Sequence, residues 1–199
     1  ADDLIAIAQT QLGYRESTKN YVVRDGDELF GYTRYGAWAG MPYEDWCAMF
    51  VSFCMEYAGV DTSRITKQAS CPRWVEILTE RGMFYKTYNA ELAALSEGQS
   101  SKSVLPADYE AYTPKPGDII FFTFSDDGNP DHVGIVKELL SDSAGKVDRV
   151  RVIEGNSSDQ VCTNVYALES KVILGYAPLP ENPDAVYERV YRGKDSTVT

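Results

Sequence analysis

The sequence predicts one α+β domain, with helices in its first half and an antiparallel sheet of about five or six strands in its second half. In the first half, apolar residues recur at helical spacing. In the second half, short segments rich in β-branched and aromatic residues alternate with turn residues. The chain has 199 residues, of which 44% are hydrophobic and 25% charged, so it is long enough to bury a core.

Three helices are predicted in the first half. Residues 4–12 have helical spacing of Leu, Ile and Ala side chains. Residues 46–58 are apolar around almost the whole helix circumference, which predicts a buried helix. We expect Asp45 to cap its start and Gly59 to end it. The third helix is predicted over 72–81, with Pro72 in its first turn.

The remaining elements are loops and strands. Residues 14–45 and 86–116 are predicted as irregular loops, the second an insertion with one short helix over 90–95. Residues 179–199 are rich in proline and charge and are predicted to be a linker or tail, which leaves a domain over 1–178. Strands are predicted over 118–124, 132–139, 147–154, 161–166 and 172–176.

Charge and composition exclude several classes of protein. The net charge is −11 and no Lys/Arg cluster is present, which argues against a nucleic-acid partner. No apolar stretch reaches the length of about 18 residues that a membrane span needs. The chain has four cysteines, no Cys-x-x-Cys and one histidine, a set that fits neither a zinc site nor a redox motif. Cys71 and Cys162 are candidates for a disulfide if the chain is secreted, but their separation in space is not fixed by the sequence.

Cys47 lies at the start of the predicted buried helix. The positive end of the helix dipole lowers a thiol pKa and favours the thiolate. The neighbouring Asp45 opposes a second negative charge, so a cationic partner such as an imidazolium is needed. Cys54 lies deeper on the same helix face and is expected to be buried and inert.

His132, the only histidine, begins the strand that leads into a predicted hairpin. If this hairpin is symmetric about Ser143, His132 lies opposite Glu154. A carboxylate there would hold one ring nitrogen and leave the other for the thiol, and Asn156 would lie diagonally beyond. The pairing depends on register, because a shift of one residue would move Glu154 to the other face. The alternative is an ion pair at a strand end, which stabilises little.

These residues lie in a series of motifs that resembles the CHAP domain (cysteine, histidine-dependent amidohydrolase/peptidase) of the papain-like superfamily. The resemblance covers roughly residues 4–178. The matching motifs, in the order of the family, are Tyr35–Trp38, Pro42–Val51, Lys115–Phe122, Asp131–Val136 and Val152–Asn156.

The resemblance implies a papain-like fold and a peptidoglycan hydrolase that cuts an amide bond in the bacterial cell wall through a thioester. It implies Cys47 as nucleophile, His132 as base, Glu154 as orienting acid and Asn156 as an auxiliary polar group. The bond could be that of an N-acetylmuramoyl-L-alanine amidase or of a stem or cross-bridge endopeptidase. Two alternatives remain, a catalytically silent cell-wall-binding or interaction module and a thiol amidase that acts on a small soluble amide.

Further expectations concern the surroundings of the site. Aromatic residues are candidates for the wall of the substrate cleft: Trp38, Tyr43, Trp46 and Trp74. Some CHAP domains bind calcium, but the acidic segment 25–28 lacks a full run of alternating oxygen ligands, so no metal or cofactor is predicted. We expect a monomer that is extracellular or associated with the cell wall.

Overall fold

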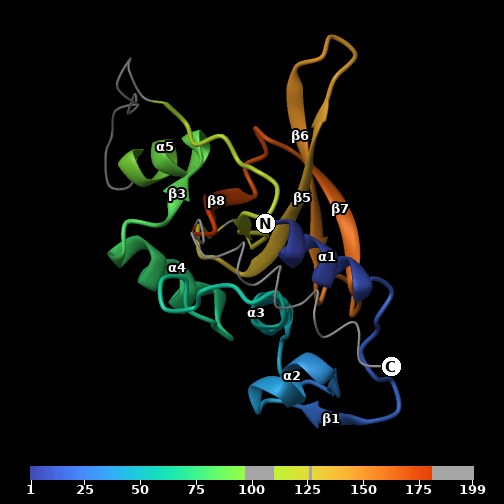
Figure 1. The fold of residues 1–199 in the computed structure, drawn as a ribbon. Coiled ribbons are helices and arrows are strands. Elements are labelled where there is room, and N and C mark those ends of the chain that lie inside the picture. The colour runs from blue at the N-terminus through green and yellow to red at the C-terminus, as the bar shows by residue number, and fades with distance from the viewer. Residues whose placement is uncertain (97–109, 126, 181–199) are drawn as a thin grey trace, which may run out of the picture.

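A computed structural model describes residues 1–96, 110–125 and 127–180 and confirms the α+β class (Figure 1). A six-stranded antiparallel sheet has the strand order β3-β8-β4-β5-β6-β7, and a two-stranded sheet lies apart from it. The helices are α1 (Asp2–Thr10), α2 (Arg34–Ala39), α3 (Cys47–Tyr57), α4 (Cys71–Glu80) and α5 (Tyr88–Ser96). The strands are β1 (Tyr21–Arg24), β2 (Glu28–Gly31), β3 (Tyr85–Lys86), β4 (Ile119–Phe122), β5 (His132–Ser141), β6 (Val147–Glu154), β7 (Cys162–Ala167) and β8 (Ile173–Ala177).

Helix α3 lies at the centre of the molecule and is buried, as its apolar circumference predicts (Figure 1). Its start differs from the prediction, because the helix begins at Cys47 and the residue in the capping position is Trp46, which makes no side-chain capping bond. The Trp46 indole is fully buried and donates a hydrogen bond from Nε1 to Glu16 Oε2 (2.8 Å). Asp45 does not cap the helix. Its carboxylate accepts a hydrogen bond from Asn156 Nδ2 (3.1 Å) instead.

The six-stranded sheet separates two apolar clusters. Side chains alternate between the faces of each strand, so neighbours such as Phe121 and Phe122 belong to different clusters. The larger cluster lies between the sheet and helices α1, α3 and α4, and includes Val133 and Ile135 of β5. The smaller cluster covers the opposite face and includes Val136. Burial of each such side chain contributes about 1.5–3 kcal/mol to folding. Both faces of β4 and β5 are therefore covered, which fixes these strands at the centre of the domain.

The prediction of an irregular loop over 14–45 is wrong. This segment contains the β1–β2 hairpin and the short helix α2, which Thr33 caps by accepting a hydrogen bond from the Gly36 amide. The acidic segment 25–28 forms the hairpin turn, where Gly26 and Asp27 have φ values of 83° and 61°. Most hairpin side chains are exposed, so the strands have no apolar alternation by which sequence patterns could reveal them.

The predicted insertion over 86–116 is described only in part. Its short helix is confirmed as α5, and Lys86 ends β3, which pairs with β8 along the edge of the sheet. The rest of the insertion, residues 97–109, lies outside the described residues, as do residues 181–199 of the predicted tail. The domain boundary at 178 stays a prediction.

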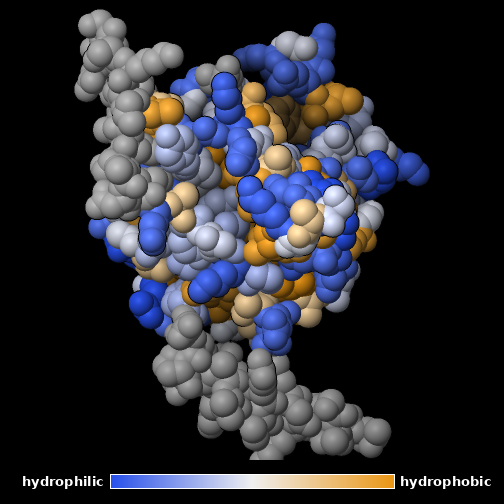
Figure 2. Space-filling view, turned by 90° about the horizontal axis from the view of Figure 1, so that it is seen from above, coloured by the Kyte–Doolittle hydropathy of each residue, from blue (hydrophilic) through white to orange (hydrophobic). Residues whose placement is uncertain are grey.

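The surface agrees with the acidic composition. On the face shown in Figure 2, hydrophilic side chains predominate and smaller hydrophobic areas lie between them. Within the described residues, none of the helices has the length and apolar character needed to cross a membrane.

The close contact between α3 and the end of β6 gives a first prediction. A Cβ added at Gly155 would lie 2.5 Å from Phe50 Cβ and 2.6 Å from Phe50 Cγ. Because Phe50 is fully buried and cannot move aside, Gly155→Ala should lower the free energy of unfolding by about 1–3 kcal/mol. Chemical denaturation measures this change. Gly128→Ala is the control, since an added Cβ meets nothing there and only a positive φ of 77° opposes it. Equal stability of Gly155→Ala and the wild type would contradict the packing described.

Candidate active site

The β5–β6 hairpin brings His132 and Glu154 together, but not in the register that symmetry about Ser143 predicts. Gly134, not His132, lies opposite Glu154, so the pairing is shifted by two residues. The turn is centred one residue later than expected, because the Asp142 side chain accepts hydrogen bonds from the Ala144 and Lys146 amides. Around the site this even shift keeps His132 and Glu154 on one face, although the register changes by one residue after Val136, nearer the turn. His132 therefore still reaches Glu154, diagonally, with 2.9 Å between Nε2 and Oε2.

The His132–Glu154 pair is buried. His132 is 8% exposed and Glu154 is 1% exposed. The carboxylate oxygen Oε2 also accepts a hydrogen bond from the Tyr166 hydroxyl (3.2 Å). Gly134 gives the carboxylate room, because a Cβ there would lie 3.0 Å from Glu154 Cγ. The arrangement fixes the imidazole plane and engages Nε2, which leaves Nδ1 as the nitrogen that can serve the thiol.

Cys47 is the first residue of α3 and its thiol interacts with His132. A hydrogen bond from Cys71 is the largest cause that lowers the pKa of Cys47, and hydrogen bonding and charge attraction to His132 lower it further. The Ala48 amide also favours the thiolate. These effects outweigh burial and bring the Cys47 pKa from 9.0 to about 5. This lowered pKa favours the thiolate form of Cys47.

The pKa of the His132 imidazole shifts in the opposite direction to that of Cys47. Burial opposes a charged ring, but hydrogen bonds and charge attraction from Cys47 and Glu154 prevail and raise the His132 pKa from 6.5 to about 10. The Cys47 pKa is thus lowered and the His132 pKa raised by their mutual attraction, which favours the thiolate–imidazolium form of the pair. This charge state combines a ready nucleophile with a ready proton donor.

Cys71 is a site residue that the sequence patterns did not indicate. It is the first residue of α4, and its sulfur lies 3.7 Å from the Cys47 sulfur. The thiolate beside it and burial raise the Cys71 pKa, so Cys71 stays protonated and donates to Cys47. The only hint in the sequence is its position between the capping Ser70 and Pro72, which places a second thiol at a helix start. The proximity of the two thiols is a tertiary contact across 24 residues.

The other two cysteines lie apart from this pair. Cys54 is fully buried, as predicted, and burial raises the pKa of its thiol. Cys162, on β7, is half-buried and approaches the Ser157 carbonyl oxygen at 3.9 Å. All four cysteines are free, so the candidate disulfide between Cys71 and Cys162 is absent. The partner of Cys71 in space is Cys47.

Asn156 follows the end of β6 in a left-handed backbone conformation, with φ of 58°. Its amide is directed to Asp45 and forms the 3.1 Å hydrogen bond described above. Asn156 thus ties the end of β6 to the residues before α3. The structure shows this link and records no hydrogen bond from Asn156 to His132 or Glu154 among the described residues.

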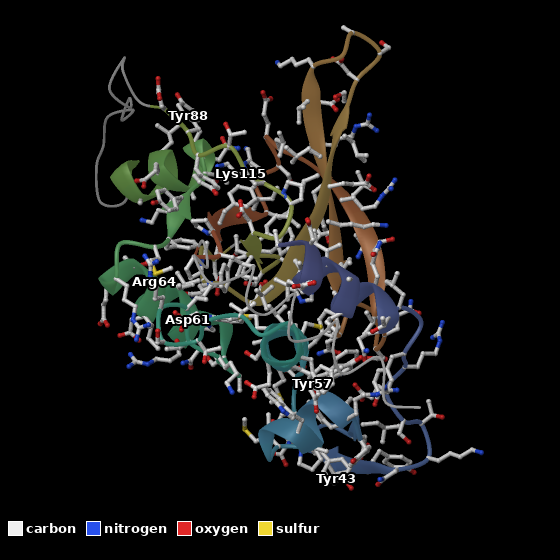
Figure 3. All side chains as sticks on the ribbon, viewed as in Figure 1. Tyr43, Tyr57, Asp61, Arg64, Tyr88 and Lys115 are labelled. Atoms are coloured by element: carbon white, nitrogen blue, oxygen red, sulfur yellow. The ribbon has the colours of Figure 1, made fainter. Side chains whose placement is uncertain are left out.

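Two of the four aromatic candidates for a cleft wall are core residues. Trp46 and Trp74 are both 0% exposed, and they pack on Tyr35 and Phe121 respectively. Their assignment as substrate contacts is wrong, because packing between α3, α4 and the sheet removes both rings from solvent. Trp38 and Tyr43 are half-buried, and so keep an exposed edge. Trp38 lies against Phe53 of α3, and Tyr43 lies beside the β1–β2 hairpin at the bottom of Figure 3.

Two hollows in the described surface lie away from these side chains. One of about 580 Å³ is lined by residues of α5 and the Thr113–Pro114 segment, and one of about 400 Å³ is lined by the start of α1 and the residues after β8. Neither includes Cys47, His132 or Glu154. The candidate site is distinguished by its buried Cys47, His132 and Glu154 and by their contacts, not by the size of a cavity.

A cysteine at a helix start, a buried histidine and an orienting carboxylate are the features that a cysteine-dependent hydrolase requires. Comparison with known families agrees with that class. The CHAP domain family model matches residues 37–156, more than half of the chain, and the chain belongs to this family. CHAP domains are usually hydrolases. Neither a search of curated proteins nor a search of solved structures found a match.

The contact between the two thiols predicts the effect of Cys71→Ala. Loss of the donated hydrogen bond should raise the pKa of Cys47 above its wild-type value of about 5. The pH dependence of Cys47 alkylation by iodoacetamide, followed by peptide mass spectrometry, measures this pKa. Cys162→Ala should leave the midpoint unchanged. A Cys71→Ala midpoint equal to that of the wild type would show that Cys71 does not stabilise the thiolate.

The single histidine makes the role of Glu154 measurable. Glu154→Gln removes the negative charge beside the ring, so the His132 pKa should fall from about 10. Because the folded pKa of His132 is raised, the stability contributed by its bound proton is lost as pH rises from about 6.5 through about 10. The contribution of the lowered Cys47 pKa is lost in the opposite direction, as pH falls from about 9 through about 5. An NMR titration of the His132 ring signals follows the pKa in both proteins. An unchanged titration would contradict the electrostatic coupling.

Proposed function

We propose that this protein is a peptidoglycan hydrolase that cleaves an amide bond of the bacterial cell wall through a Cys47 thioester. The observation that supports this most is the buried Cys47–His132–Glu154 arrangement, which lies within the segment that matches the CHAP domain. A chain retained only for binding would have no need of a thiolate–imidazolium pair with an orienting carboxylate. The proposal therefore favours an enzyme over a silent binding module.

In the first half of the proposed reaction, the Cys47 thiolate attacks the carbonyl carbon of the scissile amide. The first amides of α3 have no partner within the helix, so the amide of Cys47 is our candidate donor to the developing oxyanion. The His132 imidazolium then gives its proton to the leaving amine, and the C–N bond breaks. Glu154 keeps the imidazole oriented while its charge changes.

In the second half, the now neutral His132 accepts a proton from water, which attacks the thioester carbonyl. The C–S bond breaks, the carboxylic acid product leaves and Cys47 returns to the thiolate. Asn156 acts as an auxiliary group that holds Asp45 near the start of α3. Trp38 and Tyr43 are the remaining aromatic candidates for contact with the substrate.

The substrate sets the expected location. Peptidoglycan lies outside the cell membrane, so we propose an extracellular or wall-associated protein that acts as a monomer. The bond is either the N-acetylmuramoyl-L-alanine amide or a peptide bond of the stem or cross-bridge. Both are amides that follow the same chemistry, so the site does not distinguish them. Analysis of the digestion products does.

Substitution of the nucleophile tests the proposal. Cys47→Ala should reduce clearing of purified cell walls in a turbidity or zymogram assay by about 10³-fold or more, because no other group forms the thioester. Circular dichroism should be unchanged. Cys162→Ala is the matched control and should keep full activity. Wall clearing by Cys47→Ala at the wild-type rate would exclude Cys47 as nucleophile.

Mass spectrometry of the digestion products identifies the reaction. New amino termini on alanine released from muramic acid indicate an amidase, and new termini within the peptides indicate an endopeptidase. Intact walls after treatment with the reduced wild-type protein, combined with hydrolysis of small soluble amides, would replace the proposal by a thiol amidase. Binding to walls without any product would indicate a binding module.

A further inference from the structure

The start of α3 and the start of α4 place two thiols in contact. The sulfur atoms of Cys47 and Cys71 lie 3.7 Å apart, and both cysteines are reduced. They are 6% and 5% exposed, respectively, so each is shielded from bulky reagents but lies near the surface. Helices α3 and α4 lie next to each other in Figure 1. Amide hydrolysis by a cysteine needs one thiol, so the second calls for an explanation of its own.

The segment that carries Cys71 is anchored directly to α3. The Ser52 hydroxyl of α3 donates to the Gln68 carbonyl oxygen (2.7 Å) and accepts from the Gln68 amide (2.8 Å). Ser70 then caps α4 by accepting a hydrogen bond from the Arg73 amide. Cys71 lies one residue after this cap. Its distance from Cys47 is therefore set by two fixed helix starts.

We propose that Cys71 is a resolving cysteine that forms a reversible disulfide with Cys47 when a peroxide oxidises the nucleophile. The Cys47–Cys71 pair is then a modification site. Its disulfide removes the Cys47 nucleophile and protects Cys47 from further oxidation. The loss of hydrolysis that follows rests on the proposed function, whereas formation of the disulfide does not.

The chemistry balances with a peroxide as the oxidant. The Cys47 thiolate attacks one oxygen of hydrogen peroxide, the O–O bond breaks, and the departing hydroxide takes the His132 proton to leave as water. Cys47 is now a sulfenic acid. The Cys71 sulfur attacks the Cys47 sulfur, the S–O bond breaks, and hydroxide leaves with the Cys71 proton as a second water. A dithiol reverses the reaction by exchange and is itself oxidised.

The geometry permits this bond with a small movement. A disulfide has an S–S distance of about 2.05 Å, so the two sulfurs must approach by about 1.7 Å from their present 3.7 Å. Rotation of the two side chains supplies part of this approach without unwinding either helix. In the disulfide, Cys47 has no thiolate for attack on an amide. It also cannot proceed to sulfinic acid, which most reductants do not reverse.

Peptide mapping tests the proposal independently of hydrolysis. The full chain is reduced, treated with hydrogen peroxide, blocked with an alkylating agent and digested with trypsin. Cleavage after Arg64 and Lys67 separates Cys47 from Cys71, so a Cys47–Cys71 disulfide appears as two linked peptides. Tandem fragmentation distinguishes Cys47 from Cys54, which share one tryptic peptide. We expect this linked species to be the main product and to disappear with dithiothreitol.

Variants make the outcome decisive. Cys162→Ser is the matched control and should give the same linked peptides as the wild type. In Cys71→Ser, prolonged peroxide should convert Cys47 to sulfinic acid that dithiothreitol does not restore. Wall clearing by the wild type should fall at least about tenfold on oxidation and return with dithiothreitol, whereas Cys71→Ser should not recover.

Three results would overturn the proposal: Cys47 linked to Cys162, sulfinic acid at Cys47 in the wild type as readily as in Cys71→Ser, or the absence of an intramolecular disulfide. If the reduced wild type clears no walls, the proposed function fails while the peptide map still decides the fate of the two thiols. A linked Cys47–Cys71 pair in an inactive protein would support this site alone.

Discussion

The hydrogen bond between His132 and Glu154 is the interaction on which the site depends. A carboxylate that is 1% exposed carries a large desolvation cost unless a donor or cation meets it. His132 and Tyr166 supply such partners to Oε2, while Oε1 has no hydrogen-bond partner among the described residues. This requirement constrains the register of β5 and β6. It also favours glycine at position 134, where a side chain would crowd Glu154. Because Nε2 is engaged, the imidazole can face Cys47 only through its other nitrogen.

The start of α3 then completes the charge balance. A histidine that shares a proton with a carboxylate needs a second anion if it is to remain charged well above pH 7, and the Cys47 thiolate meets this need. Cys71 stabilises the same thiolate from the other side by donating a hydrogen bond. The two contacts differ in consequence, because an imidazolium supplies a proton for catalysis, whereas a thiol can also form a covalent bond with its partner.

The sequence patterns predicted the buried elements better than the exposed ones. Helix α3 and strands β4, β5, β6 and β8 bury many apolar side chains, so their apolar runs were sufficient to locate them. The β1–β2 hairpin exposes side chains such as Tyr21, Val23 and Leu29, and its strands therefore lack that signal. Composition also misled the assignment of Trp46 and Trp74, since a tryptophan that packs in the core and one that binds a substrate have the same letter in a sequence.

The sequence by itself determined the α+β class, the position of Cys47 at a helix start and the presence of His132 and Glu154 on one face of a hairpin. That face survived an error of two residues in register, because side chains alternate with a period of two. The tertiary structure decided what local patterns do not encode. It directed Asn156 to Asp45, and it brought Cys71 to within 3.7 Å of Cys47 across 24 residues. Such contacts depend on how helices pack, and packing is a property of the whole chain.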